Sequence, residues 1–274
     1  MVTFRKLGKL GRFGNQMFQY AGVRLLASTC GYKAVFPHWI GCEIFNDVKP
    51  WSNSESLIAK LLPTVTLSDM NSLSRKEKFL SLLGVKAKRI SLENLYTKHG
   101  DNIDIYGYLQ EIFAISQLKK NRELIKQWFT FKSEISRPLE DELFKYKPWI
   151  GVHIRRTDFV KRGLAMPIEI YVEHIRKYYP NDNIYISTDD SETRKAFSEF
   201  KILNIKNPSS KIPDFVFDFW MLSRSKILLG CGSTFSWWAA FLSESGRYFS
   251  PPLTHLIGDK NLPYWKELCD ESFI

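Results

Sequence analysis

Short apolar runs alternate with amphipathic segments along the chain, which is the pattern of an α/β protein. In the first half, this pattern predicts strands at residues 2–7 and 33–36. Between them lie a glycine-rich turn and a helix over 15–28, which we expect to end at Gly31. Residues 51–90 have an irregular helical pattern.

The second half of the chain has a more regular pattern. It predicts strands at 149–154, 183–187 and 226–229, helices at 169–179, 191–200 and 234–243, and a mostly apolar run at 215–222. A polar connection around Arg137-Pro138 precedes this regular half. We therefore predict two domains, residues 1–137 and residues 138–274.

The composition indicates a globular, basic protein. Hydrophobic residues make up 44% of the 274 residues and charged residues 25%, which excludes wholesale disorder. The net charge of +10 favours polyanions, membrane surfaces or phosphorylated ligands as partners. Basic patches at 75–78 and 86–89 lack interleaved aromatic residues and any nucleic-acid motif. We interpret them as solvated faces and expect no nucleic-acid partner.

Several sequence signals are absent. The four cysteines, at positions 30, 42, 231 and 269, lack the spacing of a zinc site or a disulfide framework. The first residues contain no apolar region typical of a signal peptide. No stretch approaches the roughly 20 apolar residues of a membrane span. These observations predict a cytoplasmic location, with peripheral contact to an anionic membrane as a further expectation from the charge.

The segment GVHIRRTDF at 151–159 is the first candidate site. Strand alternation places His153 and Arg155 on one face and Arg156 on the other, with Asp158 just beyond the strand. Ligands of open α/β sheets bind at this carboxyl end. Adjacent arginines there predict a phosphate site, because guanidinium matches phosphate in charge and shape. An Arg–Asp ion pair that stabilises the turn is the alternative.

The segment LLGCGSTFSWWAAFL at 228–242 is the second candidate. Ser233 is placed to cap an apolar helix, and free N–H groups at a helix start bind anions. The hydroxyl of Thr234 adds another donor. An ordinary loop with a serine cap is the alternative, and Trp237 and Trp238 are expected to be core residues.

Other positions carry more ambiguous signals. The glycines at 8, 11 and 14 before Asn15 fit neither the Walker nor the dinucleotide spacing. Asp189 and Asp190 follow a predicted strand, where capping of the next helix is their commoner role. Asp218 lies in an apolar run, where it either pairs structurally or reads a nucleotide base. No Asp-x-Asp pair occurs in the chain. Metal-dependent nucleotide-sugar transferases usually hold a divalent cation on the diphosphate with such a pair, so its absence favours binding of a diphosphate without metal.

Three motifs together resemble the α1,2-fucosyltransferases of glycosyltransferase family 11. They are GRFGNQMFQYAGVRLLA at 11–27, HIRRTD at 153–158 and GSTFSWWAAFLS at 232–243. YISTDD at 185–190 and GYLQ at 107–110 also resemble family elements. GVHIRRTD with PIEIY is similar to core α1,6-fucosyltransferases, and GRFGNQ to protein O-fucosyltransferases. The family's Asn-Ser-Ser is Gly-Ser-Thr at 232–234 here, and Ile227 stands where a histidine is common.

The resemblance implies a GT-B fold, in which two Rossmann-like domains face each other across a cleft. Residues 1–137 would form the acceptor side, and residues 138–274 would bind the GDP-sugar. It implies guanosine contacts from His153 and Asp218, diphosphate contacts from Arg155, Ser233 and Thr234, and a donor-sugar contact from Asn15. The full expected donor-binding set is Gly14, Asn15, His153, Arg155, Arg156, Asp190, Asp218, Ser233, Thr234 and Phe235.

The resemblance implies an inverting transfer of L-fucose from GDP-β-L-fucose to a sugar hydroxyl of a glycan acceptor. The expected acceptor atom is O2 of a β-galactoside, in the synthesis of a surface glycan or O-antigen. Arg155 is expected to stabilise the leaving GDP, and Asp158 to serve as the base. GDP-fucose is the donor substrate, and no metal or other cofactor is expected. Fucosyl transfer to another position, a related GDP-sugar, and non-catalytic binding of GDP or polyanions are the alternatives.

Overall fold

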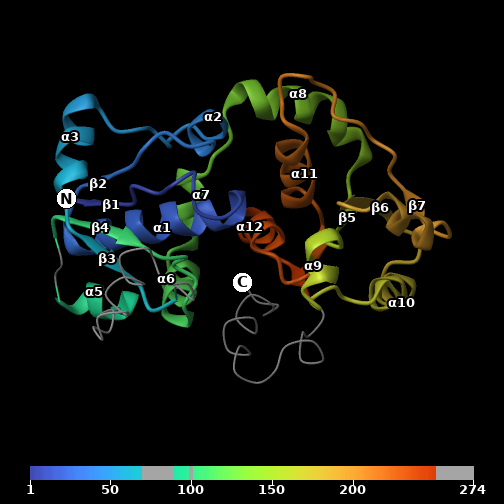
Figure 1. The fold of residues 1–274 in the computed structure, drawn as a ribbon. Helices are drawn as coiled ribbons and strands as arrows, with labels where there is room; N and C mark the ends of the chain where they lie inside the picture. The colour runs from blue at the N-terminus through green and yellow to red at the C-terminus, as the bar shows by residue number, and fades with distance from the viewer. Residues whose placement is uncertain (70–88, 99–100, 251–274) are drawn as a thin grey trace. The chain divides into compact units, whose positions relative to one another are not determined.

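The computed structural model describes residues 1–69, 89–98 and 101–250. The chain divides into two compact units, Met1–Thr130 and Phe131–Ile274, and the described residues of each unit contain one parallel sheet (Figure 1). The predicted α/β class is therefore confirmed. The basic patch at 75–78, most of the patch at 86–89 and Cys269 lie outside the described residues.

The first unit contains a four-stranded sheet in the order β2-β1-β4-β3. Its strands are β1 (Val2–Thr3), β2 (Ala34–Val35), β3 (Thr64–Thr66) and β4 (Ile103–Tyr106). Its described helices are α1 (Phe13–Cys30), α2 (Gly41–Ile44), α3 (Asn53–Leu61), α5 (Leu92–Lys98), α6 (Ile112–Lys120) and α7 (Arg122–Trp128).

Helix α1 is the central helix of this unit, and most of its residues are buried. It ends at Gly31, whose φ of 72° is left-handed and whose N–H donates to the carbonyl of Ala27. Glycine adopts this conformation without a Cβ penalty, so the predicted helix end is confirmed. The strand predicted at 2–7 is shorter, because a turn follows Phe4, where the N–H of Leu7 donates to the Phe4 carbonyl.

The second unit contains a five-stranded sheet in the order β7-β6-β5-β8-β9. The strands are β5 (Trp149–Ile154), β6 (Asn183–Thr188), β7 (Lys201–Ile202), β8 (Ile227–Leu229) and β9 (Tyr248–Phe249). The described helices are α8 (Ser133–Leu143), α9 (Thr157–Lys161), α10 (Ile168–Tyr178), α11 (Asp214–Ser223) and α12 (Thr234–Leu242), with short 3-10 helices at Phe144–Tyr146 and Ser191–Phe197.

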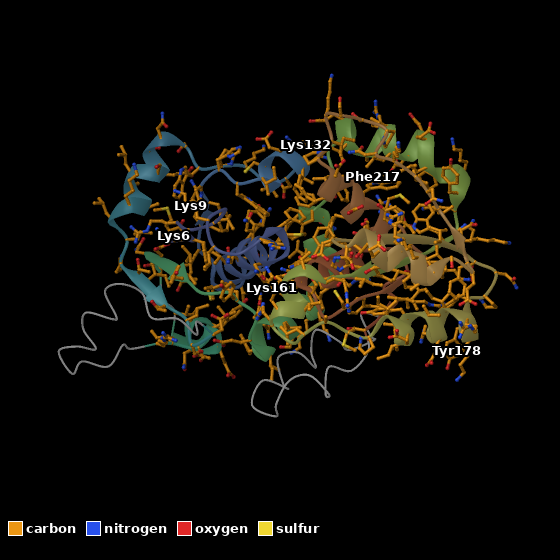
Figure 2. The ribbon with its side chains drawn as sticks, turned by 45° about the vertical axis from the view of Figure 1, so that its right-hand side comes forward. Lys6, Lys9, Lys132, Lys161, Tyr178 and Phe217 are labelled. Carbon is orange, nitrogen blue, oxygen red and sulfur yellow. The ribbon has the colours of Figure 1, made fainter. Side chains whose placement is uncertain are left out.

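The two faces of this sheet are covered by different helices (Figure 1). Val152 and Ile154 of β5 share a buried core with Tyr171 and Ile175 of α10. On the opposite face, the Trp149 indole N–H donates to the carbonyl of Met221 at the end of α11, at 3.0 Å. Figure 2 shows the side chains on this framework, including Phe217 of α11 and the exposed Tyr178 of α10. Because β5 is covered on both sides, all six of its residues are buried.

The expected domain boundary at Arg137-Pro138 lies inside helix α8 rather than in a connection. Only one face of α8 is apolar, and it buries Ile135, Leu139 and Leu143. The polar residues that suggested a linker belong to the other face of this helix. The two compact units separate between Thr130 and Phe131.

Close packing on the α11 face generates a stability prediction. A Cβ added to Gly151 would lie 2.8 Å from the Ser225 Oγ, which is itself held by a 2.7 Å hydrogen bond to the Leu222 carbonyl. Gly151→Ala should therefore lower the free energy of unfolding by about 1–3 kcal/mol, measured by calorimetry. The double variant Gly151→Ala/Ser225→Gly should lose less free energy of unfolding than the sum of the losses in the two single variants. Simple additivity would contradict this contact.

Candidate nucleotide-binding site

The candidate side chains of the second unit gather at the carboxyl edge of its sheet. Strands β5 and β6 are paired in parallel, with His153 opposite Ser187 and Ile154 opposite Thr188. Strand β8 pairs Leu229 with Val152 and leads into the loop at 230–233. The chain segments that follow these three neighbouring strands therefore begin at one edge, where ligands of α/β sheets bind.

Arg155 and Asp158 form a bidentate ion pair at this edge. The Arg155 Nε donates to one oxygen of Asp158 at 2.6 Å, and its terminal nitrogen donates to the other at 2.5 Å. The guanidinium also lies over the Phe159 ring, 4.7 Å from the ring centroid. The ion pair that the sequence left as an alternative is therefore present. It is partly exposed, and its forked geometry fixes the direction of the guanidinium.

Arg155 and Arg156 both lie beyond the end of β5 at Ile154, so their placement on opposite strand faces stays a prediction. Arg156 has partners different from those of Arg155. Its side chain donates to the Met166 carbonyl at 3.4 Å, while its backbone N–H donates to Asp189 at 2.7 Å. The Thr157 hydroxyl donates to the same carboxylate at 2.5 Å. Burial opposes ionisation of Asp189, but the hydrogen bonds from Thr157 and Arg156 outweigh it, so its pKa is lowered. Asp189 thus caps the start of α9 from the end of the neighbouring strand.

Asp190 has a structural role in the helix that follows it. One oxygen accepts from the Glu192 N–H at 3.1 Å, and the other from the Thr193 hydroxyl at 3.0 Å. These contacts are those of a helix N-cap, which is the commoner of the two roles predicted for Asp190. They direct the Asp190 carboxylate toward its own helix, and its expected contact with the donor stays a prediction.

His153 is buried on the α11 face of the sheet. Burial, and then the nearby charge of Arg155, lowers the pKa of His153 to about 4. Its Nδ1 lies 3.6 Å from the Sγ of Cys231, and burial raises the pKa of that thiol to about 12. Both side chains are therefore neutral near pH 7. The imidazole also contacts the ring of Phe235, with the two centroids 5.3 Å apart.

Asp218 projects from α11 toward the end of β6. One carboxylate oxygen accepts from the hydroxyl of Tyr185, and the other accepts from the Ser187 hydroxyl at 2.9 Å. Burial raises the pKa of Asp218, although these hydrogen bonds lower it in part. The structural partners of Asp218 in these contacts are thus two hydroxyls of β6. The alternation in Ile-Tyr-Ile-Ser, which puts Tyr185 and Ser187 on one face, was the signal that could have found them.

The loop before α12 completes this edge of the sheet. Gly232 has a φ of 68°, a left-handed conformation that glycine adopts readily. Ser233 caps α12 by accepting from the Phe235 N–H at 3.2 Å, which confirms the predicted cap. Trp237 and Trp238 are fully buried, so their prediction as core residues is also confirmed. The start of α12 thus provides backbone N–H groups and the Thr234 hydroxyl next to Phe235.

Asn15 and Gly14 lie in the first unit, in the first turn of α1. The Asn15 Oδ1 accepts from the Nε2 of Gln110 at 2.8 Å. Exposed Lys6 and Lys9 extend from the loop that precedes α1 (Figure 2). Gln110 belongs to the GYLQ segment, which the sequence identified by resemblance without assigning it a role.

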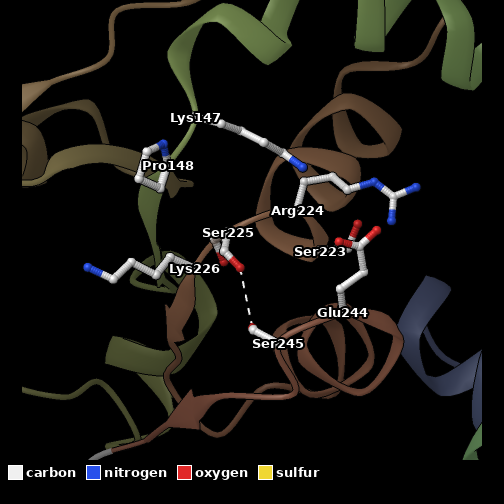
Figure 3. A pocket seen from close by; sticks show the side chains of 8 residues that line it. All are labelled: Lys147, Pro148, Ser223, Arg224, Ser225, Lys226, Glu244 and Ser245. Carbon is white, nitrogen blue, oxygen red and sulfur yellow. Dashed lines mark hydrogen bonds between the residues drawn. The ribbon is translucent and has the colours of Figure 1, made fainter.

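A pocket of about 200 Å³ lies at the opposite, amino end of β5 and β8 (Figure 3). Its lining includes Lys147, Arg224 and Lys226, together with Glu244. Arg224 lies 3.9 Å from Glu140, and Lys226 lies 3.3 Å from Asp182. Since α11 and α12 end beside this pocket, its cations are placed to compensate the partial negative charge of the helix ends. None of the expected donor-binding residues lines it.

Two features are absent from the part of the chain that the structure describes. No group of three or more His, Cys, Asp and Glu side chains there could hold a metal ion. Among the described helices, none combines the length and the apolar character that crossing a membrane requires.

The neutral state of His153 generates a pH prediction. Between pH 6.5 and about 4, the unfolded chain protonates this histidine while the folded chain leaves it neutral. Stability therefore falls as the pH is lowered through this window, with a contribution from His153 of about 3 kcal/mol at most. His153→Gln should lose less stability than the wild type between pH 7 and 4.5 in denaturant unfolding. Equal losses would contradict the buried neutral imidazole.

The fold is similar to that of several solved fucosyltransferases. NodZ α-1,6-fucosyltransferase soaked with GDP-fucose shares 15% identity at a TM-score of 0.59, covering 91% of this chain and 94% of that chain. POFUT1 in complex with GDP shares 13% sequence identity at a TM-score of 0.54, and the match covers 91% of this chain and 97% of that chain. A mutant of Arabidopsis thaliana FUT1 in complex with GDP shares 13% sequence identity at a TM-score of 0.51, and the match covers 91% of this chain and 69% of that chain. These similarities show a fold of the GT-B type, as the motifs implied.

A search of curated proteins found no significant match. The family model of Glycosyl transferase family 11, in contrast, matches residues 5–249, which include the second sheet, the first sheet except for β1, and every candidate residue described above. The chain belongs to glycosyltransferase family 11.

Proposed function

We propose that the protein transfers L-fucose from GDP-β-L-fucose to a sugar hydroxyl with inversion at the anomeric carbon. The observation that carries this proposal is the arrangement of His153, Arg155, Asp218 and Ser233 around one carboxyl edge of a parallel sheet. Family membership supports it, as do two proteins of similar fold, POFUT1 in complex with GDP and NodZ soaked with GDP-fucose.

GDP would bind at the edge of the second unit. The neutral His153 and the carboxylate of Asp218 would face guanosine, since two acceptor oxygens suit the N1–H and N2 amino group of guanine. Each oxygen of Asp218 accepts one hydroxyl and keeps a second lone pair. Tyr185 and Ser187 would thus fix the plane of the carboxylate without exhausting its acceptors. Phe235 would provide an apolar contact beside His153.

The diphosphate would lie between the end of β5 and the start of α12. Arg155 would stabilise the negative charge that develops on the departing GDP, and Asp158 orients its guanidinium through the bidentate pair. Ser233, Thr234 and the N–H groups of α12 would supply further donors. Arg156, which donates to the Met166 carbonyl through one terminal nitrogen, would offer its other N–H groups to the diphosphate. Asn15, next to Gly14, would contact the donor sugar.

Asp158, the expected base, is paired with Arg155. Each oxygen of Asp158 accepts one hydrogen bond from Arg155 and keeps a second lone pair, so the bidentate pair holds the carboxylate against the guanidinium without using all of its acceptor sites. Orientation of Arg155 is therefore the role that the contacts of Asp158 favour. With GDP as a good leaving group, the acceptor proton can also leave late or through water.

The proposed acceptor is the O2 hydroxyl of a β-galactoside in a surface glycan or O-antigen. This part rests on the resemblance of the three motifs to α1,2-fucosyltransferases. The net charge of +10 would favour an acceptor carried on an anionic membrane surface, and added salt should weaken that encounter.

The proposed reaction is tested by GDP release from GDP-fucose in the presence of lactose, with the linkage of the product resolved. Release should continue at a near-normal rate in EDTA, because arginine and helix N–H groups replace a metal at the diphosphate. Hydrolysis without transfer, or binding without release, would contradict the proposal. A loss in EDTA that Mn²⁺ or Mg²⁺ restores would contradict the metal-free mechanism.

Arg155 is tested by two substitutions with a matched control. Arg155→Ala should lower kcat by at least ~100-fold, within the range for loss of one preorganised electrostatic contact. Arg155→Lys should recover little, since an ammonium cannot form the forked pair with Asp158. Arg162→Ala, at an exposed position, should be near normal. Retention of most activity in Arg155→Lys would show that charge alone suffices.

Asp218 is tested through nucleotide binding. Asp218→Asn should weaken GDP binding roughly 10- to 100-fold, because an amide offers one acceptor where two are needed, while Tm stays close to that of the wild type. Asp214→Asn makes the same charge change at an exposed position of α11 and is the control. Normal GDP binding by calorimetry, or equal affinity for UDP, would assign Asp218 a structural role.

A further inference from the structure

Asp69 fixes the backbone of the GYLQ segment in the first unit. It follows β3, while residues 107–110 follow the neighbouring parallel strand β4, so both lie beyond the same edge of that sheet. One oxygen of Asp69 accepts from the Tyr108 N–H at 3.0 Å, and the other accepts from the Gln110 N–H at 3.1 Å. A Cβ on Gly107 would lie 2.7 Å from the first of these oxygens, so the glycine allows the carboxylate to approach. One side chain thus holds both ends of the Tyr108–Gln110 turn.

Leu109, between the two bonded N–H groups, has a left-handed φ of 55°, which is rare for a residue with a Cβ. Its side chain is fully buried against α1, where a Cβ on Gly22 would lie 2.6 Å from the Leu109 Cδ2. This unfavourable backbone conformation persists where surrounding contacts impose it. Asp69 and the close approach to Gly22 are the contacts that impose it here.

The result of this arrangement is a directed amide at position 110. The Gln110 side chain is buried, and its Nε2 donates to the Asn15 Oδ1 at 2.8 Å. On the other side of Asn15, a Cβ on Gly11 would lie 2.6 Å from the Asn15 Nδ2. Gly11 has a φ of 75°, so glycine is needed there for both its backbone conformation and its lack of a side chain. Asn15 is therefore oriented by a hydrogen bond from one side and by close packing on the other.

We propose that Asp69 and Gln110 are positioning residues for Asn15: Asp69 sets the GYLQ turn, and Gln110 thereby fixes which way the Asn15 amide points. The catalytic consequence of this inference rests on the proposed function, in which Asn15 contacts the donor sugar. The orientation of the amide is independent of the proposed function, because every contact that determines this orientation lies within the first unit.

The orientation is tested by the side-chain ¹⁵NH₂ resonances of Asn15, assigned by their loss in Asn15→Asp. In Gln110→Glu, an oxygen replaces the donating Nε2 and repels the Asn15 Oδ1, so these resonances should move. Asp69→Asn should also move them, because it removes one of the two acceptors that hold the turn. Gln127→Glu makes the same change as Gln110→Glu at an exposed position and should leave them in place.

Unchanged Asn15 resonances in folded Gln110→Glu would overturn the inference. If the resonances move in Gln110→Glu but not in folded Asp69→Asn, Asp69 is not a positioning residue. If Asp69→Asn does not fold, Gln110→Glu decides. This measurement needs no donor, so it stands even if the protein proves not to release GDP from GDP-fucose. Failure of the proposed function would be seen separately, as absence of that release in the wild type.

The catalytic consequence is tested by a double-mutant cycle on kcat. Gln110→Glu should lower kcat roughly 10- to 100-fold, the scale expected for misplacement of a contact group, while GDP affinity stays normal. If Gln110 acts through Asn15, adding Gln110→Glu to Asn15→Ala should cause little further loss. Independent, multiplicative losses would show that Gln110 acts by another route and would contradict its positioning role.

Discussion

The parallel pairing of β5 with β6 determines where the polar groups of the second unit meet. Because Trp149 lies opposite Asn183 and Ile154 opposite Thr188, both strands end at the same level. His153 and Ser187 therefore lie side by side, and the segments after them begin together. A shift of one residue would turn His153 to the α10 face and remove it from Cys231 and Phe235. The apolar residues buried against α10 make such a shift costly, so core packing fixes the geometry of the site.

The same constraint operates in the first unit on a smaller scale. Strands β3 and β4 pair in parallel, with Thr66 opposite Tyr106, and this brings Asp69 to the GYLQ segment. The two units thus use one device, in which a carboxylate after one strand captures backbone N–H groups after its neighbour. Asp189 does this for the start of α9, and Asp69 does it for the turn that directs Gln110 toward Asn15.

Local patterns in the sequence predicted the second unit best. The continuous apolar run of β5 and the Ser233 cap of α12 are encoded within a few residues, and both were found as predicted. Strands β3 and β4 were missed, because their short runs lie in the part of the chain with the least regular pattern. The run at 215–222 was not assigned to a helix, since apolar residues on nearly all sides give no period.

The hydrogen-bond partners of the candidate residues were harder to predict than the candidate residues themselves. The pairing of Asp218 with Tyr185 and Ser187 joins residues more than thirty positions apart, and it depends on how α11 crosses β6. Asp189 caps a helix that precedes it in the chain by a similar distance, whereas sequence reasoning considered only the helix that follows. Side-chain partners across a sheet edge depend on tertiary arrangement, which local spacing does not encode.

The proposed GDP site is the carboxyl edge of the second sheet, and the pocket at the amino end of that sheet is the competing site. Hydrogen–deuterium exchange with and without GDP distinguishes these two edges directly. Peptides that cover 153–158 and 230–236 should gain protection, while those that cover Lys147 and 223–226 should stay unchanged. Protection confined to Lys147, 223–226 and 244–245 would contradict the account.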